Sequence, residues 1–276
     1  MESAIYIVAT PIGNLSDITI RAIEILKSVD LVAAEDTRHT RKLLDHYDIR
    51  TKMVSLHDHN EQQKSQGIVE RVLGGGSLAL VSDAGTPLIS DPGHSLVNEA
   101  KKQGVKVVPI PGPSAIIAAL CAAGIPCGKF IFEGFLPSKK KAKTDVLMSY
   151  SVERKSVVFY ESPHRVLDTL ECMQEVFGDR DIAVAREITK RFETIKRGPI
   201  PELLEWMSQD NNQQKGEFVL VLAGMTSVEE SSSDLEKKVM LARLLTDLPP
   251  KKASAIVSDL LGGSKKEIYN LALSLK

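Results

Sequence analysis

Short apolar runs that do not alternate with polar residues most constrain how this 276-residue chain can fold. Leu78–Val81 reads Leu-Ala-Leu-Val, and similar short runs occur at 4–10 and 31–34. A strand with apolar side chains on both faces is buried on both faces, which is typical of a parallel sheet covered by helices. Segments with helical spacing of apolar residues separate these runs. The first half of the chain therefore predicts an α/β domain.

Prolines mark the end of this predicted domain. Three prolines and a glycine fall within Pro109–Pro113, which is typical of a boundary. We therefore expect a first domain over 1–112 with a mostly parallel sheet. Its expected strands cover 4–10, 31–34, 77–82 and 105–110, and its helices 18–28, 37–47, 61–73 and 92–103.

The second half of the chain is richer in strand-like segments. Short turns join several of them, so this sheet should contain antiparallel pairs. We expect a second α/β domain with a mixed sheet over 113–226, its first helix capped by Ser114. The expected strands cover 130–133, 156–160, 181–185, 192–196 and 217–222, and the helices 114–121, 142–151, 163–177 and 201–208.

A polar segment at 227–233 predicts a linker to a helical appendage over 234–276. Three helical stretches follow it, at 234–246, 250–260 and 264–275. Pro249-Pro250 and Gly262-Gly263 separate these stretches.

Net charge, apolar runs and cysteine content limit the possible partners and the cellular compartment. The net charge is -1, so any binding of nucleic acid depends on local basic patches. No apolar run reaches the roughly 20 residues that a membrane span needs, and the first residues do not resemble a signal peptide. The three cysteines lack metal or disulfide spacing, which predicts buried free thiols in a reducing, cytoplasmic compartment.

Three loops of small residues follow predicted strands, at 10–14, 82–93 and 111–115. Ligands collect at the carboxyl ends of strands in open α/β sheets, so we expect the three loops to converge on one crevice. Asp83 and Asp91 in the central loop either face a cationic ligand or cap the next helix. Taken alone, this loop is also consistent with a tight turn.

Several common motifs are absent. The chain contains neither the dinucleotide-binding GxGxxG after a strand nor the P-loop GxxxxGK[ST]. His57 and His59, two residues apart, would share one face of a strand, but no third metal ligand stands near them. Gly74-Gly75-Gly76 ends a predicted helix and indicates a turn. We therefore expect no metal site.

Charged clusters follow other strands. Asp36 and Arg38 follow the second strand, where Asp36 or Thr37 caps a helix or the pair points into the crevice. The basic stretch at 139–143 is either a solvated face or a phosphate contact.

Seven segments, in this order, resemble the class III methyltransferases, the tetrapyrrole-methylase superfamily. More narrowly, they are similar to the bacterial 2′-O-ribose methyltransferases of that superfamily, which modify a decoding-centre cytidine in the small-subunit (16S) ribosomal RNA. The resemblance covers roughly residues 4–224. Its segments are VATPIGNLSD (8–17), AEDTRHTR (34–41), VSDAGTPLISDPG (81–93), PIPGPSA (109–115), FYESPHR (159–165), AREITK (185–190) and GEFVLV (216–221).

The resemblance implies two α/β domains with a cleft between them that binds S-adenosyl-L-methionine. Carried over by position, the cofactor contacts fall in the three loops and at two places in the second domain. Asp83 is added to this set because it lies in the central loop. The residues are Pro11, Asp83, Ala84, Gly85, Thr86, Ile89, Ser114, Ala115, Glu161 and Thr189.

Departures from the tetrapyrrole enzymes favour the RNA-modifying branch. The first loop reads Ala-Thr-Pro-Ile-Gly-Asn in place of a GxGPGD-type loop, and Glu161 stands at a position that is usually apolar. The alternatives are a methyltransferase that acts on a tetrapyrrole or another small acidic acceptor, and a non-catalytic ribosome-binding protein.

A ribose hydroxyl is a weak nucleophile, so a base or a cation near it would help. From charge type and position we expect Asp36 or Glu187 as base or orienter, and Arg38 and Lys190 as phosphate or hydroxyl contacts. The alternative is that these four residues form structural ion pairs. The expected partner is ribosomal RNA in the small subunit, contacted through 139–143 and the tail lysines, with a homodimer implied by the resemblance. Those lysines are Lys251, Lys252, Lys265 and Lys266.

Overall fold

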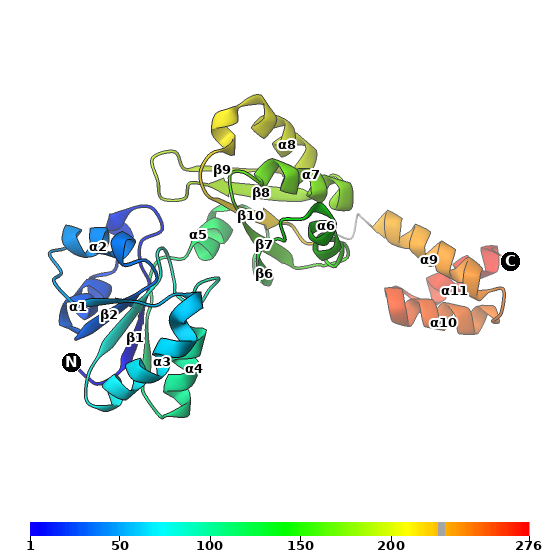
Figure 1. Cartoon of the computed structure of the whole chain (residues 1–276). Helices are drawn as coiled ribbons and strands as arrows, with labels where there is room; N and C mark the ends of the chain where they lie inside the picture. Colours follow the sequence, from blue (N-terminus) through cyan, green and yellow to red (C-terminus); the bar gives the residue numbers. More distant parts are fainter. Residues whose placement is uncertain (226–229, 276) are drawn as a thin grey trace. The chain divides into compact units, whose positions relative to one another are not determined.

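The computed structural model describes residues 1–225 and 230–275, and the side chains of all of these except 230–236. The chain forms two compact units (Figure 1). The larger unit contains residues 1–151 and 155–223, and the smaller one contains 152–154 and 224–276. Both predicted sheets lie in the larger unit, so the boundary that the sequence places near residue 112 stays a prediction.

The first sheet has five strands in the order β3-β2-β4-β1-β5, and all its pairs are parallel. This confirms the parallel α/β arrangement expected from the apolar runs. β3 was not predicted, because it has three residues, all half-buried at the edge of the sheet. The strands are β1 (Ile5–Val8), β2 (Leu31–Ala34), β3 (Met53–Ser55), β4 (Leu78–Val81) and β5 (Val107–Ile110).

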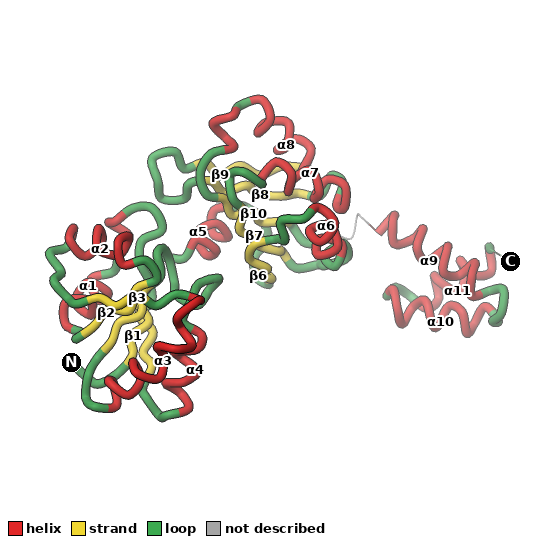
Figure 2. Tube along the Cα trace, in the orientation of Figure 1, coloured by secondary structure: helices red, strands yellow, loops and turns green. Residues whose placement is uncertain are grey.

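Helices cover both faces of this sheet (Figure 2). One face packs against Leu26 of α1 and Leu44 of α2, and the other against Val69 of α3 and Leu96 of α4. Burial on both faces explains why β4 carries apolar residues without alternation. The helices are α1 (Ile20–Ser28), α2 (Thr37–His46), α3 (Asp58–Leu73) and α4 (His94–Lys102).

The second sheet has the order β6-β7-β10-β8-β9. Only β6 and β7 pair in parallel, while β7–β10, β10–β8 and β8–β9 are antiparallel, which confirms the mixed sheet. The strands are β6 (Phe130–Phe135), β7 (Ser156–Glu161), β8 (Asp181–Arg186), β9 (Thr194–Pro199) and β10 (Phe218–Leu222).

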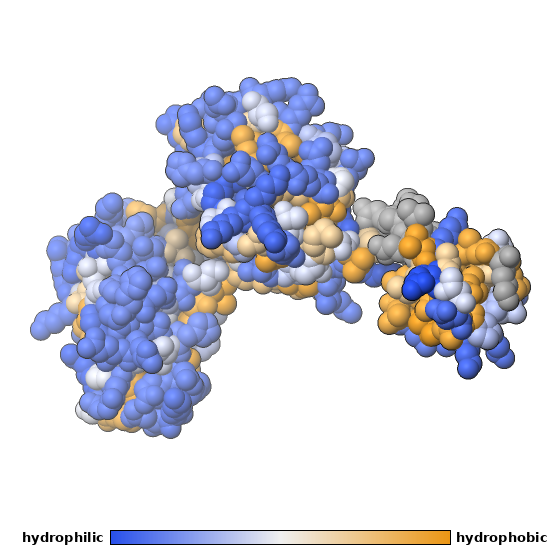
Figure 3. Space-filling view, turned by 45° about the vertical axis from the view of Figure 1, so that its right-hand side comes forward, coloured by the Kyte–Doolittle hydropathy of each residue, from blue (hydrophilic) through white to orange (hydrophobic). Residues whose placement is uncertain are grey.

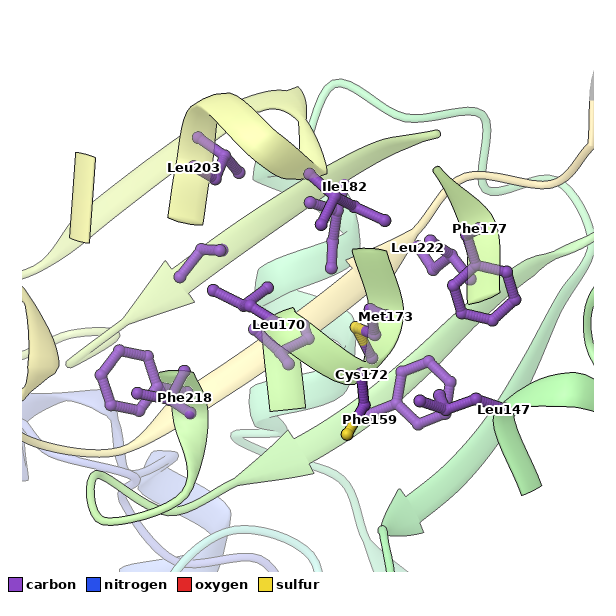
Figure 4. Packing of buried hydrophobic residues seen from close by; sticks show 14 of the residues in the cluster. Leu147, Phe159, Leu170, Cys172, Met173, Phe177, Ile182, Leu203, Phe218 and Leu222 are labelled. Atoms are coloured by element: carbon purple, nitrogen blue, oxygen red, sulfur yellow. The ribbon is translucent and has the colours of Figure 1, made fainter. Parts of the chain in front are cut away.

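The main core of the second sheet lies under three helices. Phe159, Leu170, Met173 and Leu220 are fully buried there, and Figure 4 shows most of the cluster around α7. The other face packs against α5, through residues such as Leu120. The helices are α5 (Ala115–Ala122), α6 (Lys140–Met148), α7 (Val166–Phe177) and α8 (Ile200–Gln209).

The smaller unit is a bundle of α9 (Glu230–Leu244), α10 (Pro250–Leu261) and α11 (Lys265–Ser274). Leu241, Val257 and Ile268 form its core. Large apolar residues are also exposed on it, and Figure 3 shows hydrophobic side chains on its visible face. The linker predicted at 227–233 is wrong from residue 230 onward, which is helical; 226–229 lie outside the described residues.

Two local expectations were wrong. Cys172 is buried as predicted, but Cys121 and Cys127 are exposed, because they lie at the end of α5 and in the turn after it. His57 does not lie on a strand: it occupies the N-cap position of α3, and His59 lies in the first turn of that helix. No helix in the described ranges is both long and apolar enough to cross a membrane.

Candidate active site

Three loops converge on one cavity of about 350 Å³ in the larger unit. The Thr10 and Gly85 N–H groups each donate to the other's carbonyl, at 2.8 and 3.0 Å, and the Thr86 hydroxyl donates to the Pro113 carbonyl at 3.1 Å. These bonds join the loops that follow β1, β4 and β5, as the sequence predicted. The cavity is lined by Ile12, Glu35, Asp83, Ala84, Gly85, Thr86, Ile89, Ser90, Asp91, Ser114, Ala115, Phe135, Tyr160, Glu161, Ser162, Pro163, Ile188, Glu217, Phe218 and Val219.

Glycine at position 85 is required where the first two loops meet. Gly85 has a φ of +82°, and a Cβ there would lie 3.3 Å from Cγ2 of Ile12. A side chain would be strained and would also enter the crowded lining. The glycine therefore lets the backbone itself form part of the cavity wall.

The second part of the central loop is strained and is held from outside the cavity. Leu88 and Ser90 have φ values of +74° and +64°, a region that non-glycine residues rarely adopt. The buried carboxylate of Glu61, on α3, accepts hydrogen bonds from the Gly93 and Leu96 N–H groups at 3.1 and 3.2 Å, and from the Ser95 N–H. Glu61 thus caps α4, whose N-cap residue is Gly93, and anchors the loop.

The lining is acidic. Among its described residues five are acids, and none is Lys, Arg or His. The Asp83 carboxylate accepts from the Asp36 N–H at 3.0 Å, and the Asp83 N–H donates to Glu35 at 3.3 Å. Burial and the neighbouring acids raise the pKa of Glu35, and burial, with charge repulsion from Glu35 and Asp83, raises the pKa of Asp91 to about 6. Such a site favours a cationic ligand over an anionic one.

Glu161 closes the wall of the cavity on the side of the second sheet. Its side chain is fully buried, and its carboxylate accepts from the Ser162 N–H at 2.8 Å and from the Thr169 hydroxyl at 2.6 Å. Arg165 lies 3.4 Å away, and the buried Lys143 donates to Thr169 at 2.8 Å. The Glu161 carboxylate is therefore engaged by protein groups.

Lys143 does not belong to the basic surface that the sequence predicted. It is 2% exposed, whereas Lys140 of the same helix is exposed and pairs with Glu175 at 2.6 Å. In this basic stretch Lys139, Lys140 and Lys141 are exposed, whereas Lys143 is buried.

Most of the predicted cofactor contacts line the cavity, and two do not. Pro11 lines a smaller cavity of about 40 Å³ that shares Asp83 with the larger one. Thr189 packs against the first loop instead: a Cβ added to Gly13 would lie 2.8 Å from Oγ1 of Thr189. Those that line the cavity are Asp83, Ala84, Gly85, Thr86, Ile89, Ser114, Ala115 and Glu161.

Asp36 and Arg38 form an ion pair beside the cavity. Their side chains are 2.7 Å apart, the Asp36 carboxylate also caps α2 through the Arg38 N–H, and the Arg38 side chain is 90% exposed. Hydrogen bonds from Arg38 hold the pKa of Asp36 well below its usual range. A carboxylate of such low basicity is a weak proton acceptor at neutral pH.

Glu187 and Lys190 form a second pair, 2.8 Å apart. Lys190 also contacts Glu217, which lines the cavity, at 2.9 Å. Burial raises the pKa of Glu187, but hydrogen bonds from Lys190 and the Glu217 N–H outweigh this and lower it. Neither Glu187 nor Lys190 lines the cavity, so their catalytic role stays a prediction.

The lining residues that were not predicted as site residues include Glu35, Phe135, Tyr160 and Glu217. Each lies at or next to the end of a strand, which is the signal that could have found them. Burial and then the charge of Asp91 raise the pKa of Tyr160 to about 12. In the described part of the chain, no group of three or more His, Cys, Asp or Glu side chains is placed to hold a metal ion.

Two family models match the chain. Residues 4–204 match the Tetrapyrrole (Corrin/Porphyrin) Methylases, and residues 231–276 match the RsmI C-terminal HTH domain. Both assignments agree with the division into a large α/β unit and a small helical one.

Relatives and solved structures extend this similarity. The chain is 51% identical to a ribosomal RNA small subunit methyltransferase I from Vibrio cholerae serotype O1, over 98% of this chain and 94% of the relative. It is 49% identical to the protein of the same name from Escherichia coli O157:H7, over 99% and 95%. The crystal structures of the methyltransferase CobJ and of diphthine synthase share the fold, each with a TM-score of 0.59, at 17% and 16% identity. They cover 80% and 83% of this chain, and the match spans 94% and 93% of theirs.

Proposed function

The chain belongs to the tetrapyrrole methylases and, within them, to the ribosomal RNA small subunit methyltransferase I family, and from this membership we propose its reaction. It transfers the methyl group of S-adenosyl-L-methionine to the 2′-hydroxyl of a cytidine in the 16S RNA of the small ribosomal subunit.

The acidic cavity is the observation that carries the proposal. S-adenosylmethionine bears a sulfonium and an ammonium group, and the lining offers carboxylates without a competing cation. The bare backbone at Gly85 lets a ligand approach closely, and Ala84, Thr86 and Ile89 follow in the same loop. Asp83, Ser114 and Ala115 complete the set of residues that would hold the cofactor.

When bound, the cofactor supplies a methyl group already activated by the positive sulfur. The chain then has to hold the acceptor oxygen about 3–3.5 Å from that carbon and in line with it. Glu61 and the hydrogen bonds between the loops fix the cavity wall before a ligand enters. Preorganisation of this kind reduces the ordering that is required at the reacting atoms.

Within the proposal, Glu35 is a better base for the ribose hydroxyl than Asp36. It lines the cavity, and burial raises its pKa, whereas Asp36 is paired with Arg38 and has a lowered pKa. A positioned base of suitable pKa contributes about 10²–10⁴-fold. Lys190 is placed behind Glu217 to orient that carboxylate.

The same lining disfavours the tetrapyrrole alternative. An acidic macrocycle would require cationic side chains around it, and the described lining contains five acids. A solvent-accessible ribose in looped RNA carries no charge at the reacting atom, so it tolerates this environment.

The proposal also covers the RNA partner, the cellular compartment and the oligomeric state. Exposed lysines at 139–141 and in the tail, such as Lys251 and Lys265, supply the local basic patches that RNA binding requires. Free thiols are consistent with a reducing cytoplasm. We further propose that the chain acts as a homodimer.

The test is transfer of label from radiolabelled S-adenosylmethionine to small subunits, or to naked ribosomal RNA, from cells that lack this activity. We expect label on one cytidine ribose. Cofactor binding without label in either RNA would reject the RNA acceptor and favour a small acidic one. Subunit binding without cofactor binding would indicate a non-catalytic protein.

A further inference from the structure

The cavity lining includes an exposed aromatic ring that is not among the expected cofactor contacts. Phe135 is the last residue of β6, lines the cavity and is 57% exposed. A large apolar side chain left open in a ligand cavity indicates a ligand with an apolar or aromatic face.

Phe135 packs against the ring of Tyr160, which in turn contacts Phe132. The Phe135 and Tyr160 ring centroids are 5.4 Å apart with the rings tilted, and Phe132 packs edge-on against Tyr160 at 5.1 Å. Since Phe135 remains more than half exposed despite these contacts, it forms a stacking surface. Unstacked RNA bases bind to such surfaces.

The backbone places this ring beside the acidic loop. The register between β6 and β7 shifts between Phe132 and Gly134, and Gly134 has a φ of +82°. A Cβ on Gly134 would lie 3.3 Å from Oγ of Ser90. Phe135 directly follows Gly134, and Asp91 directly follows Ser90. Both Phe135 and Asp91 line the cavity.

We propose that Phe135 and Asp91 form the subsite for the target cytosine. The base, turned out of the RNA, stacks on the Phe135 ring, and its exocyclic amino group donates to the Asp91 carboxylate. Uracil has a carbonyl oxygen at that position, which the carboxylate repels, so the subsite selects cytidine. This inference rests on the proposed function and deepens it by assigning the recognition of the base.

The first experiment measures kcat/KM for small subunits and, separately, the Kd for S-adenosylmethionine by calorimetry, using the full chain. The variants are Phe135→Ala, Phe135→Leu and Phe135→Tyr. Phe130→Ala is the matched control, because Phe130 lies on the same strand, is 40% exposed and does not line the cavity.

We expect Phe135→Ala and Phe135→Leu to lower kcat/KM by about tenfold or more, the effect of losing one stacked base. Phe130→Ala should stay close to wild type, Phe135→Tyr should lose less kcat/KM than Phe135→Leu because it keeps the ring, and the cofactor Kd should not change in any variant. If Phe135→Ala does not fold, the comparison of Leu with Tyr decides, since both retain a large side chain and only Tyr retains a ring.

The second experiment compares subunits that carry cytidine or uridine at the methylated position. The wild type should prefer cytidine by about tenfold or more, and Asp91→Ala should lower activity on cytidine and reduce this preference. Equal activity of Phe135→Ala and Phe130→Ala, a loss of cofactor affinity in Phe135→Ala, or an unchanged preference in Asp91→Ala overturns the subsite alone. A wild-type chain that labels no cytidine overturns the proposed function and the subsite with it.

Discussion

The surroundings of Asp91 raise the pKa of its side chain well above the ordinary value for aspartate. It is half-buried among Glu35, Asp83 and Asp58, whose charges oppose its ionisation, while the Ser82 hydroxyl favours it. Burial is the larger effect, and together they give a pKa of about 6. The charge of Asp91 in turn contributes to the raised pKa of Tyr160. At neutral pH Asp91 is therefore ionised, but at a cost to the stability of the fold.

This cost predicts a pH-dependent gain in stability for Asp91→Asn. The pKa of Asp91 is about 6 in the folded protein against its ordinary value of 3.8, so the folded state binds more protons between these values. The stability that this group contributes is present below about pH 4 and is lost as pH rises to about 6. Thermal unfolding should show a Tm gain for Asp91→Asn of roughly 2–4 °C above pH 6, which disappears toward pH 4.

Asp179→Asn is the control, because Asp179 is exposed. It should change Tm little at any pH. A gain for Asp91→Asn that does not depend on pH would show that the buried charge is not its cause.

At the scale of elements, α6 and α7 are joined to β7 by a buried polar chain. Lys143 of α6 donates to Thr169 of α7, which donates to Glu161 at the end of β7. Charged groups this deeply buried are stable only when they are paired or hydrogen-bonded. These hydrogen bonds therefore connect the wall of the cavity to α6 and α7.

Removal of Lys143 from this series of hydrogen bonds should strongly destabilise the protein. Lys143→Ala leaves Glu161 buried with less compensation, and we expect a loss of about 3 kcal/mol in the free energy of unfolding, measured with urea. Lys140→Ala, on the exposed face of the same helix, removes only a surface ion pair and should cost less than about 1 kcal/mol. Equal losses for the two variants would contradict the proposed role of the buried chain.

At the scale of the whole molecule, the cavity and the helical tail belong to different units. Every residue that lines the cavity precedes residue 224, and the tail has a separate core around Leu241, Val257 and Ile268. We therefore expect the proposed cofactor binding and the proposed recognition of the RNA substrate to be separable.

A chain truncated after Gly224 should bind S-adenosylmethionine with a Kd within about twofold of the full chain, by calorimetry. Its kcat/KM for small subunits should fall on the order of tenfold and depend less on salt, because the exposed lysines of the tail are lost. In the full chain, combined Lys265→Ala and Lys266→Ala should reproduce part of this effect. Loss of cofactor binding on truncation would show that the larger unit needs the tail to fold.

Local sequence patterns determined much of this architecture. The non-alternating run at Leu78–Val81 predicted a strand buried on both faces, and the parallel sheet followed from several such runs. Since parallel strands end at the same edge, the loops after β1 and β4 had to meet, as Thr10 and Gly85 do. The short edge strand β3 was missed because three half-buried residues leave no periodic signal.

Only the tertiary structure decided which side chain of a charged segment serves which purpose. Glu35 lines the cavity, while the adjacent Asp36 caps α2 and pairs with Arg38. Lys143 is buried on Thr169, while Lys140, one turn earlier, is exposed. The physical reason is that burial and hydrogen-bond partners come from segments distant in the chain. Spacing along the sequence determines the element, but not what packs against it.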